Sequence, residues 1–193
     1  MSVEIELKAH VENPEAMKAA ISLLTSCLPL SFEKEDCYWD GVRLRRESLR
    51  HPDGGVEEKV LVTYKSKEVR EGIEINDERE FTVSDADVFT ELLKRLGLEP
   101  GVRKHKQGWG WTYGNIHAEL AEVSGEVSGN TRSDLPVRNL GWFLELEILA
   151  DEAGAETVAA ARGELLGLLE RLKVGKECIE ERYYAEMLGD QKA

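Results

Sequence analysis

The sequence has few aromatic residues, few cysteines and no long hydrophobic run. No apolar segment approaches the ~20 residues that a membrane-spanning helix needs, and charged residues stand where a signal peptide would have its apolar core. The three cysteines, Cys27, Cys37 and Cys178, form no CxxC pair, and none has a histidine at zinc-ligand spacing. These absences argue against a membrane protein, a disulfide-rich secreted protein and a structural zinc site, and they favour the reducing cytoplasm.

Charged residues of both signs are abundant in the chain. It contains 38 acidic and 25 basic residues among 193, which gives a net charge of -13, while 41% of its residues are hydrophobic. This apolar fraction is sufficient for a packed core and therefore excludes wholesale disorder. The negative charge argues against a nucleic acid wrapped over the surface, because such binding depends on neutralising phosphates. The sequence still allows a small anionic ligand to bind in a local basic pocket.

Hydrophobic periodicity predicts many strands and few helices. Residues 3–10 alternate strictly between apolar and charged, which is typical of a strand with one charged face. Asn13 and Pro14 then open a helix over 14–28. The other expected elements are a strand pair turning at Gly41 within 35–47, strands at 60–67, 78–83, 102–111, 116–123 and 141–149, a helix from a capping box at 84–87 to residue 96, a mobile loop between the last two strands, and helices at 151–174 and 178–188.

This order of elements, β-α-β-β-β-β-α-β-β-β-α-α, has about eight strands and few helical crossovers. It predicts an α+β fold with a mostly antiparallel sheet, which commonly closes into a barrel to remove its edges. We expect a single domain over residues 1–193.

Charged residues recur in pairs spaced by two along the predicted strands. This spacing places both side chains of a pair on one face, about 7 Å apart. For a single strand, the simplest interpretation is a solvated outer face. Gathered inside one barrel, the same groups would form a lumen too charged to pack dry, which would hold water, metal and a highly charged ligand. The acidic pairs are Glu4 with Glu6, Glu78 with Glu80 and Glu145 with Glu147; the basic pairs are Arg43 with Arg45 and Lys104 with Lys106; Lys8 and Lys65 add single amines.

These groups belong to motifs that follow a recognisable order. The chain opens with VEIELK, an ExExK pattern, and continues with DCYWD at 36–40, VRLR at 42–45, VTYK at 62–65, ExExxVxD at 78–85, KHK at 104–106, GWFLELE at 141–147 and RYYAEML at 182–188. In this order the motifs resemble the CYTH family of triphosphate tunnel metalloenzymes, which includes class IV adenylyl cyclases, thiamine triphosphatases and inorganic triphosphatases. The resemblance implies an eight-stranded antiparallel β-barrel, or tunnel, with flanking helices, in which basic side chains grip a triphosphate and glutamates hold Mg²⁺ or Mn²⁺.

The resemblance also implies a role for each charged group. Metal binding is expected from Glu4, Glu6, Glu145 and Glu147, and phosphate contacts are expected from Lys8, Arg43, Arg45, Lys65, Lys104 and Lys106. Of the basic residues, the expected catalytic ones are Lys8, Arg43, Arg45 and Lys65. Supporting roles, in ordering the basic residues or assisting the metal, are expected from Glu78, Glu80 and Glu119.

Several positions depart from the family pattern. Lys106 stands where an Arg is usual, which keeps the charge but loses bidentate phosphate geometry. Asn76 and Arg182 stand where an Arg and a Ser are common. Ala121 replaces a metal-binding Asp, and strand alternation with Glu119 predicts that it points into the lumen.

The reaction that the resemblance implies is in-line attack on phosphorus. A ribose 3′-hydroxyl would give cyclic AMP and pyrophosphate, as in a class IV adenylyl cyclase, which is our leading interpretation. Water would instead give a triphosphatase for thiamine triphosphate, inorganic triphosphate or a nucleoside triphosphate. The departures keep open a catalytically weak triphosphate-binding module, and a barrel whose charge is incidental remains the simplest alternative. The expected partner is a small-molecule triphosphate, without nucleic acid or membrane, and a homodimer stays open.

Overall fold

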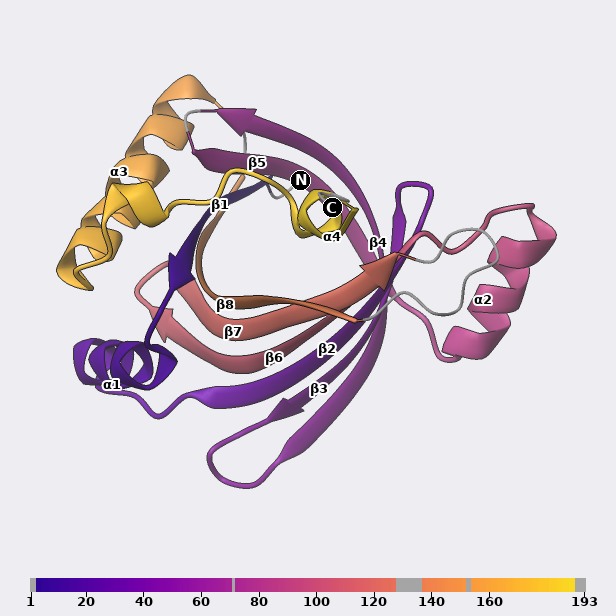
Figure 1. The fold of residues 1–193 in the computed structure, drawn as a ribbon, viewed down its shortest axis with the longest axis horizontal. Helices are drawn as coiled ribbons and strands as arrows, with labels where there is room; N and C mark the ends of the chain where they lie inside the picture. Colours follow the sequence, from indigo (N-terminus) through magenta and orange to yellow (C-terminus); the bar gives the residue numbers. More distant parts are fainter. Residues whose placement is uncertain (1–2, 71, 128–136, 152–153, 190–193) are drawn as a thin grey trace.

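The protein folds into a closed antiparallel barrel of eight strands with helices packed around it (Figure 1). The computed structural model describes residues 3–70, 72–127, 137–151 and 154–189. The strand order around the barrel is β1-β5-β4-β3-β2-β6-β7-β8, and pairing of β8 with β1 closes it. The strands are β1 (Val3–Val11), β2 (Leu30–Trp39), β3 (Val42–Arg50), β4 (Val56–Arg70), β5 (Ile73–Thr82), β6 (Val102–Tyr113), β7 (Ile116–Val127) and β8 (Arg138–Ala150). The helices are α1 (Pro14–Thr25), α2 (Ala86–Arg95), α3 (Ala155–Arg171), the 3₁₀ turn η1 (Lys176–Cys178) and α4 (Tyr184–Gly189). The α+β barrel expected from the sequence is confirmed.

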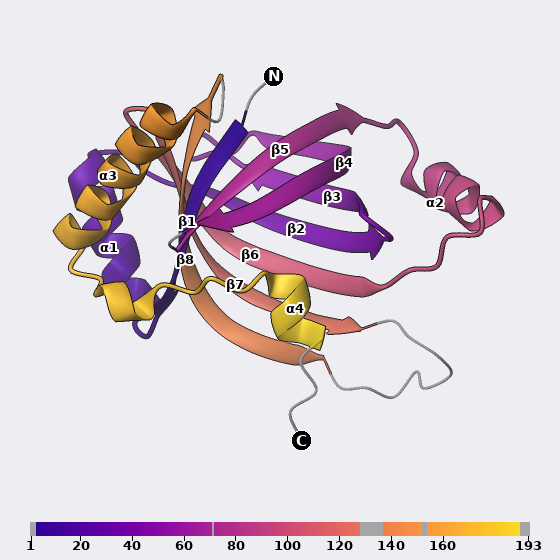
Figure 2. The same cartoon turned by 90° about the horizontal axis from the view of Figure 1, so that it is seen from above.

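The largest apolar core lies outside the barrel, between its wall and two helices. Ile5 and Leu7 on β1 have no exposed surface, and they pack in one cluster with Ile21 of α1 and Leu165 of α3. Figure 2 shows α1 and α3 side by side on this wall, with α2 at the other end of the barrel. Because successive strand residues point to opposite faces, the inward face is left for the residues between these apolar ones.

A smaller apolar cluster attaches α2 to the outer face of β2, β3 and β4. It contains Trp39, Leu44 and Val62 from the strands, with Ala86 and Leu93 from the helix. Among the described residues, no helix is long and apolar enough to cross a membrane.

Local sequence signals explain where the elements begin. The Asn13 carboxamide oxygen accepts a hydrogen bond from the Ala16 amide at 3.1 Å, so Asn13 caps α1 as expected. Asp85 caps α2 by accepting from the amides of Asp87 and Val88, so the cap lies within the expected box but on its second residue.

The hairpin between β2 and β3 also follows its sequence. Asp40 and Gly41 both have positive φ, 42° and 90°, as a two-residue hairpin turn requires. This confirms the turn expected at Gly41.

One expectation about element boundaries is wrong, and another falls mainly outside the described residues. The polar stretch expected between 67 and 78 is instead the continuation of β4 and β5, which meet in a short turn near Gly72 at φ 80°. The mobile loop expected between β7 and β8 falls mainly on residues 128–136, which lie outside the described residues.

The helix expected over 178–188 is wrong in its first half. Ile179 pairs with Ala9 of β1 in an isolated bridge, and the Glu180 amide donates to the Lys8 carbonyl at 2.8 Å. The reason is tertiary: β5 pairs with β1 only from Val3 to Glu6, so this edge of β1 further along is completed by the C-terminal segment.

Candidate functional site

The barrel encloses a cavity of about 480 Å³ whose wall is mostly charged. All eight strands contribute to it, and Tyr183, Tyr184 and Ala185 close one side. The acidic lining residues are Glu4, Glu6, Glu47, Glu74, Glu80, Glu119, Glu145 and Glu147; the basic ones are Lys8, Lys34, Arg43, Arg45, Lys104 and Lys106. Of the remaining lining residues, Gly41, Leu61 and Ala185 have no polar side chain.

The structure brings together most of the residues that the sequence motifs singled out. Eleven of the thirteen line this one cavity: Glu4, Glu6, Lys8, Arg43, Arg45, Glu80, Lys104, Lys106, Glu119, Glu145 and Glu147. The other two, Lys65 and Glu78, lie opposite each other in the register of β4 and β5, but their side chains fall outside the described residues. The charged pairs whose side chains are both described therefore share one lumen and are not separate solvated faces.

Strand register places three carboxylates in one row across the inner wall. Glu6 lies opposite Glu74 on β5 and opposite Glu147 on β8, and Glu147 also lies opposite His117 on β7. Directly opposite residues have Cβ atoms about 4.5–5.5 Å apart, so like charges here repel one another. Lys8 reduces the repulsion between these carboxylates, because its Nζ donates to Glu74 at 2.7 Å.

This row has the chemistry of a divalent-metal site that substrate completes. Across the described part of the chain, no three His, Cys, Asp or Glu side chains converge into a ready-made metal cluster. Mg²⁺ is usually bound by only one or two carboxylates, with substrate phosphates and water supplying the other oxygens. Glu6 and Glu147, which face each other on neighbouring strands and line the cavity, fit that donor set.

Lys106 lies at the centre of a buried ion network. Its Nζ donates to Glu119 at 2.6 Å and also to Glu145, and the Lys34 Nζ donates to the second oxygen of Glu119 at 2.6 Å. Burial alone would raise the pKa of Glu145, but the Lys106 ammonium outweighs it and lowers this pKa to about 2. Burial likewise opposes ionisation of Glu119, yet Lys106 and Lys34 hold its pKa well below the ordinary value. Both carboxylates are therefore ionised at neutral pH.

His117 extends this network toward the carboxylate row. It lies 3.1 Å from Glu119, and this hydrogen bond raises the pKa of the imidazole despite its burial. The raised pKa favours an additional positive charge in the cavity near neutral pH.

Asp36 anchors two of the cavity cations. Arg45 donates to both of its oxygens, at 2.7 and 3.0 Å, and the Lys104 Nζ lies at 3.0 Å. The Asp36 side chain has no exposed surface, which alone would raise its pKa, but Arg45 and Lys104 hold this pKa well below its ordinary value. The guanidinium is thereby fixed in orientation before any ligand arrives.

Arg43 is ordered by a second, lighter set of contacts. Its Nη2 donates to the Thr63 hydroxyl at 2.9 Å and lies 3.5 Å from Glu80, to which the same hydroxyl donates at 3.1 Å. Glu80 thus contacts Arg43 both directly and through Thr63, which is how a residue that orders a basic side chain would be placed.

The C-terminal segment supplies the last side of the cavity. The Tyr184 hydroxyl donates to Glu145 at 2.5 Å, and the ammonium groups of Lys8 and Lys104 lie 4.7 and 5.1 Å from the centre of its ring. Burial and the Glu145 carboxylate raise the pKa of Tyr184 well above its ordinary value, so the phenol stays protonated and keeps donating.

Glu180 fixes this segment to the barrel. It accepts hydrogen bonds from the Arg182 guanidinium, at 2.9 and 2.6 Å, and lies 3.1 Å from His10 of β1. The bonds from Arg182 lower the pKa of Glu180 to about 2.

Ala121 lies on the same strand face as Glu119, as expected, but it is not among the residues that line the cavity. It is fully buried, and its register neighbours are Gly108 and Phe143. The position where the family usually has a metal-binding Asp therefore lies toward the apolar cluster of Val123, Phe143 and Tyr184.

Sequence reasoning missed several residues of the site. The missed residues include Lys34, Asp36, Tyr38, Glu47, Thr63, Glu74, His117 and Tyr184. In β2 the run Glu33, Lys34, Glu35, Asp36 is charged on both faces, so no apolar alternation marks the inward one. The available signal was the spacing of two residues between Asp36 and Tyr38 within the DCYWD motif, because this spacing places both side chains on one face of a strand.

A closed antiparallel barrel whose lumen interleaves lysines and arginines with glutamates has the chemistry of a site for a compact polyanion and a divalent metal. The chain belongs to the CYTH family: the family model, described as the CYTH domain, matches residues 2–184. Members of this family are metal-dependent triphosphate tunnel enzymes.

Solved structures share this fold. The PH1012 protein of Pyrococcus horikoshii OT3 is 25% identical, with a TM-score of 0.69 over 96% of this chain and 99% of that chain. A candidate adenylate cyclase of Vibrio parahaemolyticus is 19% identical, with a TM-score of 0.66 over 96% and 97% of the two chains. The candidate adenylyl cyclase HpAC1 of Hippeastrum, described as having a dominant triphosphatase activity, is 16% identical, with a TM-score of 0.53 over 100% and 97%. A search of curated proteins finds no match.

Proposed function

We propose that the protein is a divalent-metal-dependent phosphoryl-transfer enzyme whose substrate is a linear triphosphate. The observation that carries the proposal is the charge of the cavity wall. Eight carboxylates and six Lys or Arg side chains line it, and 6 − 8 leaves a formal charge of -2 on these described residues. Such a wall repels a bare polyphosphate and accepts one that arrives with divalent metal.

The carboxylates divide into two groups in this proposal. Glu6 and Glu147, with Glu4 beside them, would hold Mg²⁺ or Mn²⁺, and Glu145 would join them by exchanging Lys106 for the metal. When bound, the metal neutralises phosphate charge and polarises the phosphoryl group under attack. Glu47, Glu74, Glu80 and Glu119 keep the basic side chains in place: Glu47 lies 3.4 Å from the Lys34 Nζ, and the other three make the contacts described above.

The cations would bind the phosphate oxygens. Arg45 and Lys104 are anchored by Asp36, Lys8 by Glu74, and Arg43 by Thr63. A phosphate chain between them would receive hydrogen bonds from several directions without a large loss of side-chain entropy, since these side chains are already ordered. Lys65 is assigned to the same set by its motif.

Hydrolysis is the reaction that the cavity supports best. A water oxygen would form a bond to the terminal phosphorus while the bond from that phosphorus to the bridging oxygen breaks, which yields a diphosphate, phosphate and a proton. The wall offers charge and hydroxyl groups at nearly every position, which suits a compact triphosphate more than a large apolar group.

Cyclisation of ATP is the second candidate, and two observations favour it. The tyrosines Tyr38 and Tyr183 line the cavity and offer ring surface to a base, and the similar Vibrio parahaemolyticus protein is a candidate adenylate cyclase. Here the ribose 3′-oxygen would attack the α-phosphorus and pyrophosphate would leave. We further propose a cytoplasmic enzyme, because all three cysteines are free thiols.

One assay separates these reactions. Purified protein is incubated with tripolyphosphate, thiamine triphosphate or ATP, with Mg²⁺ or Mn²⁺, and phosphate, pyrophosphate and cyclic AMP are measured. Phosphate release supports hydrolysis, and cyclic AMP with pyrophosphate supports the cyclase. Triphosphate binding without turnover would show a binding module, and absence of both binding and turnover would contradict the proposal.

Arg43→Ala provides the matched mutational test. We expect it to weaken metal–triphosphate binding by about 1.5–3 kcal/mol, the range for hydrogen bonds to charged groups. The control is Arg46→Ala, on the same strand but exposed and paired with Asp87 on the outer wall. Isothermal titration should show a loss for Arg43→Ala alone, and equal affinities for the two variants would place the ligand elsewhere.

The metal role is tested by combining Glu4→Gln with Glu6→Gln. This change removes charge with little change in volume, so we expect the metal-free fold to persist while the metal-dependent thermal stabilisation by triphosphate disappears. The control is Glu33→Gln on the exposed face of β2. A thermal shift that survives in the double variant would exclude these two residues as metal ligands.

A further inference from the structure

Helix α2 is apolar on two faces, and only one of them is covered. Ala86 and Leu93 are buried against the barrel, whereas Val88, Leu92 and Leu96 are 67%, 49% and 67% exposed. Their spacing of four residues places them in one line along the helix, which we call the α2 stripe. Single exposed apolar residues are common, but three in a line on one element indicate a contact surface.

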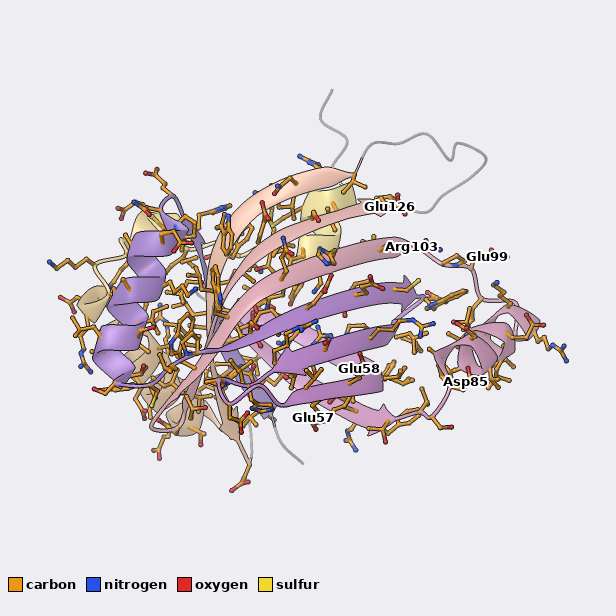
Figure 3. All side chains as sticks on the ribbon, turned by 90° about the horizontal axis from the view of Figure 1, so that it is seen from below. Glu57, Glu58, Asp85, Glu99, Arg103 and Glu126 are labelled. Carbon is orange, nitrogen blue, oxygen red and sulfur yellow. The ribbon has the colours of Figure 1, made fainter. Side chains whose placement is uncertain are left out.

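The position of α2 leaves this stripe open to a partner. Figures 1 and 2 show α2 standing at the end of the barrel opposite α1 and α3, joined to β5 and β6 by connections. In Figure 3, Asp85 marks the start of α2 and Glu99 lies on the connection from α2 to β6, and side chains project from the helix on several sides. A second molecule could therefore reach the stripe without touching the helices at the other end.

The charges of α2 decide which partner fits. Asp85 caps the helix and Asp87 lies in its first turn, while Lys94 and Arg95 lie in its last turn. Asp87 and Arg95 make ion pairs within their own molecule, with Arg46 and Glu91, but these pairs are exposed, and such surface pairs are weak enough to exchange for contacts with a partner. Two such helices placed antiparallel bring the basic end of each against the acidic end of the other, and their helix dipoles also oppose favourably. An anionic lipid surface fits poorly, because the chain carries a net charge of -13.

We propose that the α2 stripe is a homodimer interface in which α2 of one molecule packs antiparallel on α2 of a second copy. The arrangement has two-fold symmetry, so the same surface serves both molecules and the association stops at two. A helix of 10 residues is only about 15 Å long, and the contact is therefore smaller than the ~1,200–2,000 Å² of stable complexes. The dimer is weak and depends on protein concentration.

Sedimentation velocity over a wide range of protein concentrations tests the interface. The wild-type protein should change from monomer to dimer as concentration rises, and Leu92→Glu should remain monomeric. The matched control is Leu23→Glu on α1, which also replaces an exposed leucine, 84% exposed, and should dimerise like the wild type. Circular dichroism and thermal unfolding confirm that both variants are folded. A wild-type monomer at every concentration, or a dimer that Leu92→Glu leaves intact, overturns the proposal.

Charge exchange tests the antiparallel arrangement independently. Arg95→Glu and Asp87→Lys should each weaken the homodimer, because like charges then meet at both ends. An equimolar mixture should form a heterodimer, since each altered end meets an opposite charge. If the mixture associates no better than the separate variants, the helices are not antiparallel. Flotation with zwitterionic lipid vesicles completes the test, and vesicle binding that Leu92→Glu abolishes would replace the second copy by a lipid surface.

Discussion

Asp36 is the counter-charge of two largely buried cations, so removing its charge would leave both of them unbalanced. Its side chain has no exposed surface and faces Arg45 and Lys104, which are themselves mostly buried. Asp36→Asn keeps the shape but leaves two cations without their counter-charge, so we expect the free energy of unfolding to fall by about 3–5 kcal/mol. Urea unfolding measures this. The control Glu35→Gln changes the exposed neighbour and should cost less than about 0.5 kcal/mol. Equal stabilities would contradict the buried pairing.

Asn76 is a buried polar residue whose replacement by an apolar one should stabilise the protein. It is fully buried on β5, opposite Glu4, and neither atom of its carboxamide has a hydrogen-bond partner among the described residues. Asn76→Leu keeps a similar shape and removes both unpaired groups, so we expect the free energy of unfolding to rise by about 1–3 kcal/mol. Asn76→Asp is the contrasting variant and should destabilise, because it buries a carboxylate beside Glu4. A leucine variant less stable than the wild type would show that this amide is paired in solution.

Some of the site residues were visible in the sequence because their neighbours are apolar. Glu4 and Glu6 alternate with Ile5 and Leu7, so the charged face of their strand was readable. Glu74 was not, because the strand that carries it was expected to begin at residue 78. His117 gave no signal either, since its meaning depends on Glu119 lying 3.1 Å away, a contact that spacing alone does not reveal.

At the scale of elements, β6 and β7 approach each other so closely at Gly108 that a side chain there would clash with backbone. A Cβ on Gly108 of β6 would lie 2.0 Å from the Leu120 carbonyl oxygen and 2.7 Å from the Ala121 Cα. Backbone must therefore move, and we expect Gly108→Ala to destabilise by about 1–3 kcal/mol. Gly163→Ala, in α3 where nothing lies within 4 Å, is the matched control and should stabilise by about 0.5–1 kcal/mol. Thermal unfolding of both variants checks the two opposite signs, and a shared sign would contradict the strand geometry.

The elements themselves were largely predictable because their signals are local. Alternation marked β1, Asn13 with Pro14 marked α1, and Gly41 marked the first hairpin. The segment before α4 was not predictable, because Ile179 and Glu180 take an extended form to complete the edge of β1, far away in the sequence. Local periodicity carries no information about an unpaired edge elsewhere.

For the whole molecule, pH should act on stability in two ways. The net charge of -13 at pH 7 vanishes near the isoelectric point of about 4.9, so repulsion weakens and stability should rise modestly over this interval. Below about pH 4.5 the trend reverses. Glu180, with an ordinary pKa of 4.5, titrates at about 2 in the folded protein, and the pKa of Asp36 is also lowered. The unfolded chain then binds more protons, so stability falls as pH approaches 2.

Urea unfolding at a series of pH values measures this profile. Glu180→Gln should flatten the decline below pH 4.5, because one carboxylate with a lowered pKa is gone. Glu177→Gln, a change at an exposed residue nearby, is the control and should leave the decline unchanged. A wild-type protein whose stability is constant from pH 5 to 2 would contradict the lowered pKa values.

The closure of the barrel has a consequence for how the protein is made on the ribosome. β1 is synthesised before every other strand, yet it pairs with β8, which ends at Ala150, and its apolar face is covered by α3, which follows. The nascent chain can form the consecutive hairpins from β2 to β5 and from β6 to β8 as they emerge, but β1 has only its short pairing with β5, from Val3 to Glu6, until β8 is made. Ribosomes stalled before residue 138 should therefore display Ile5 and Leu7 to chaperones, and release of the complete chain is the step at which this exposure ends.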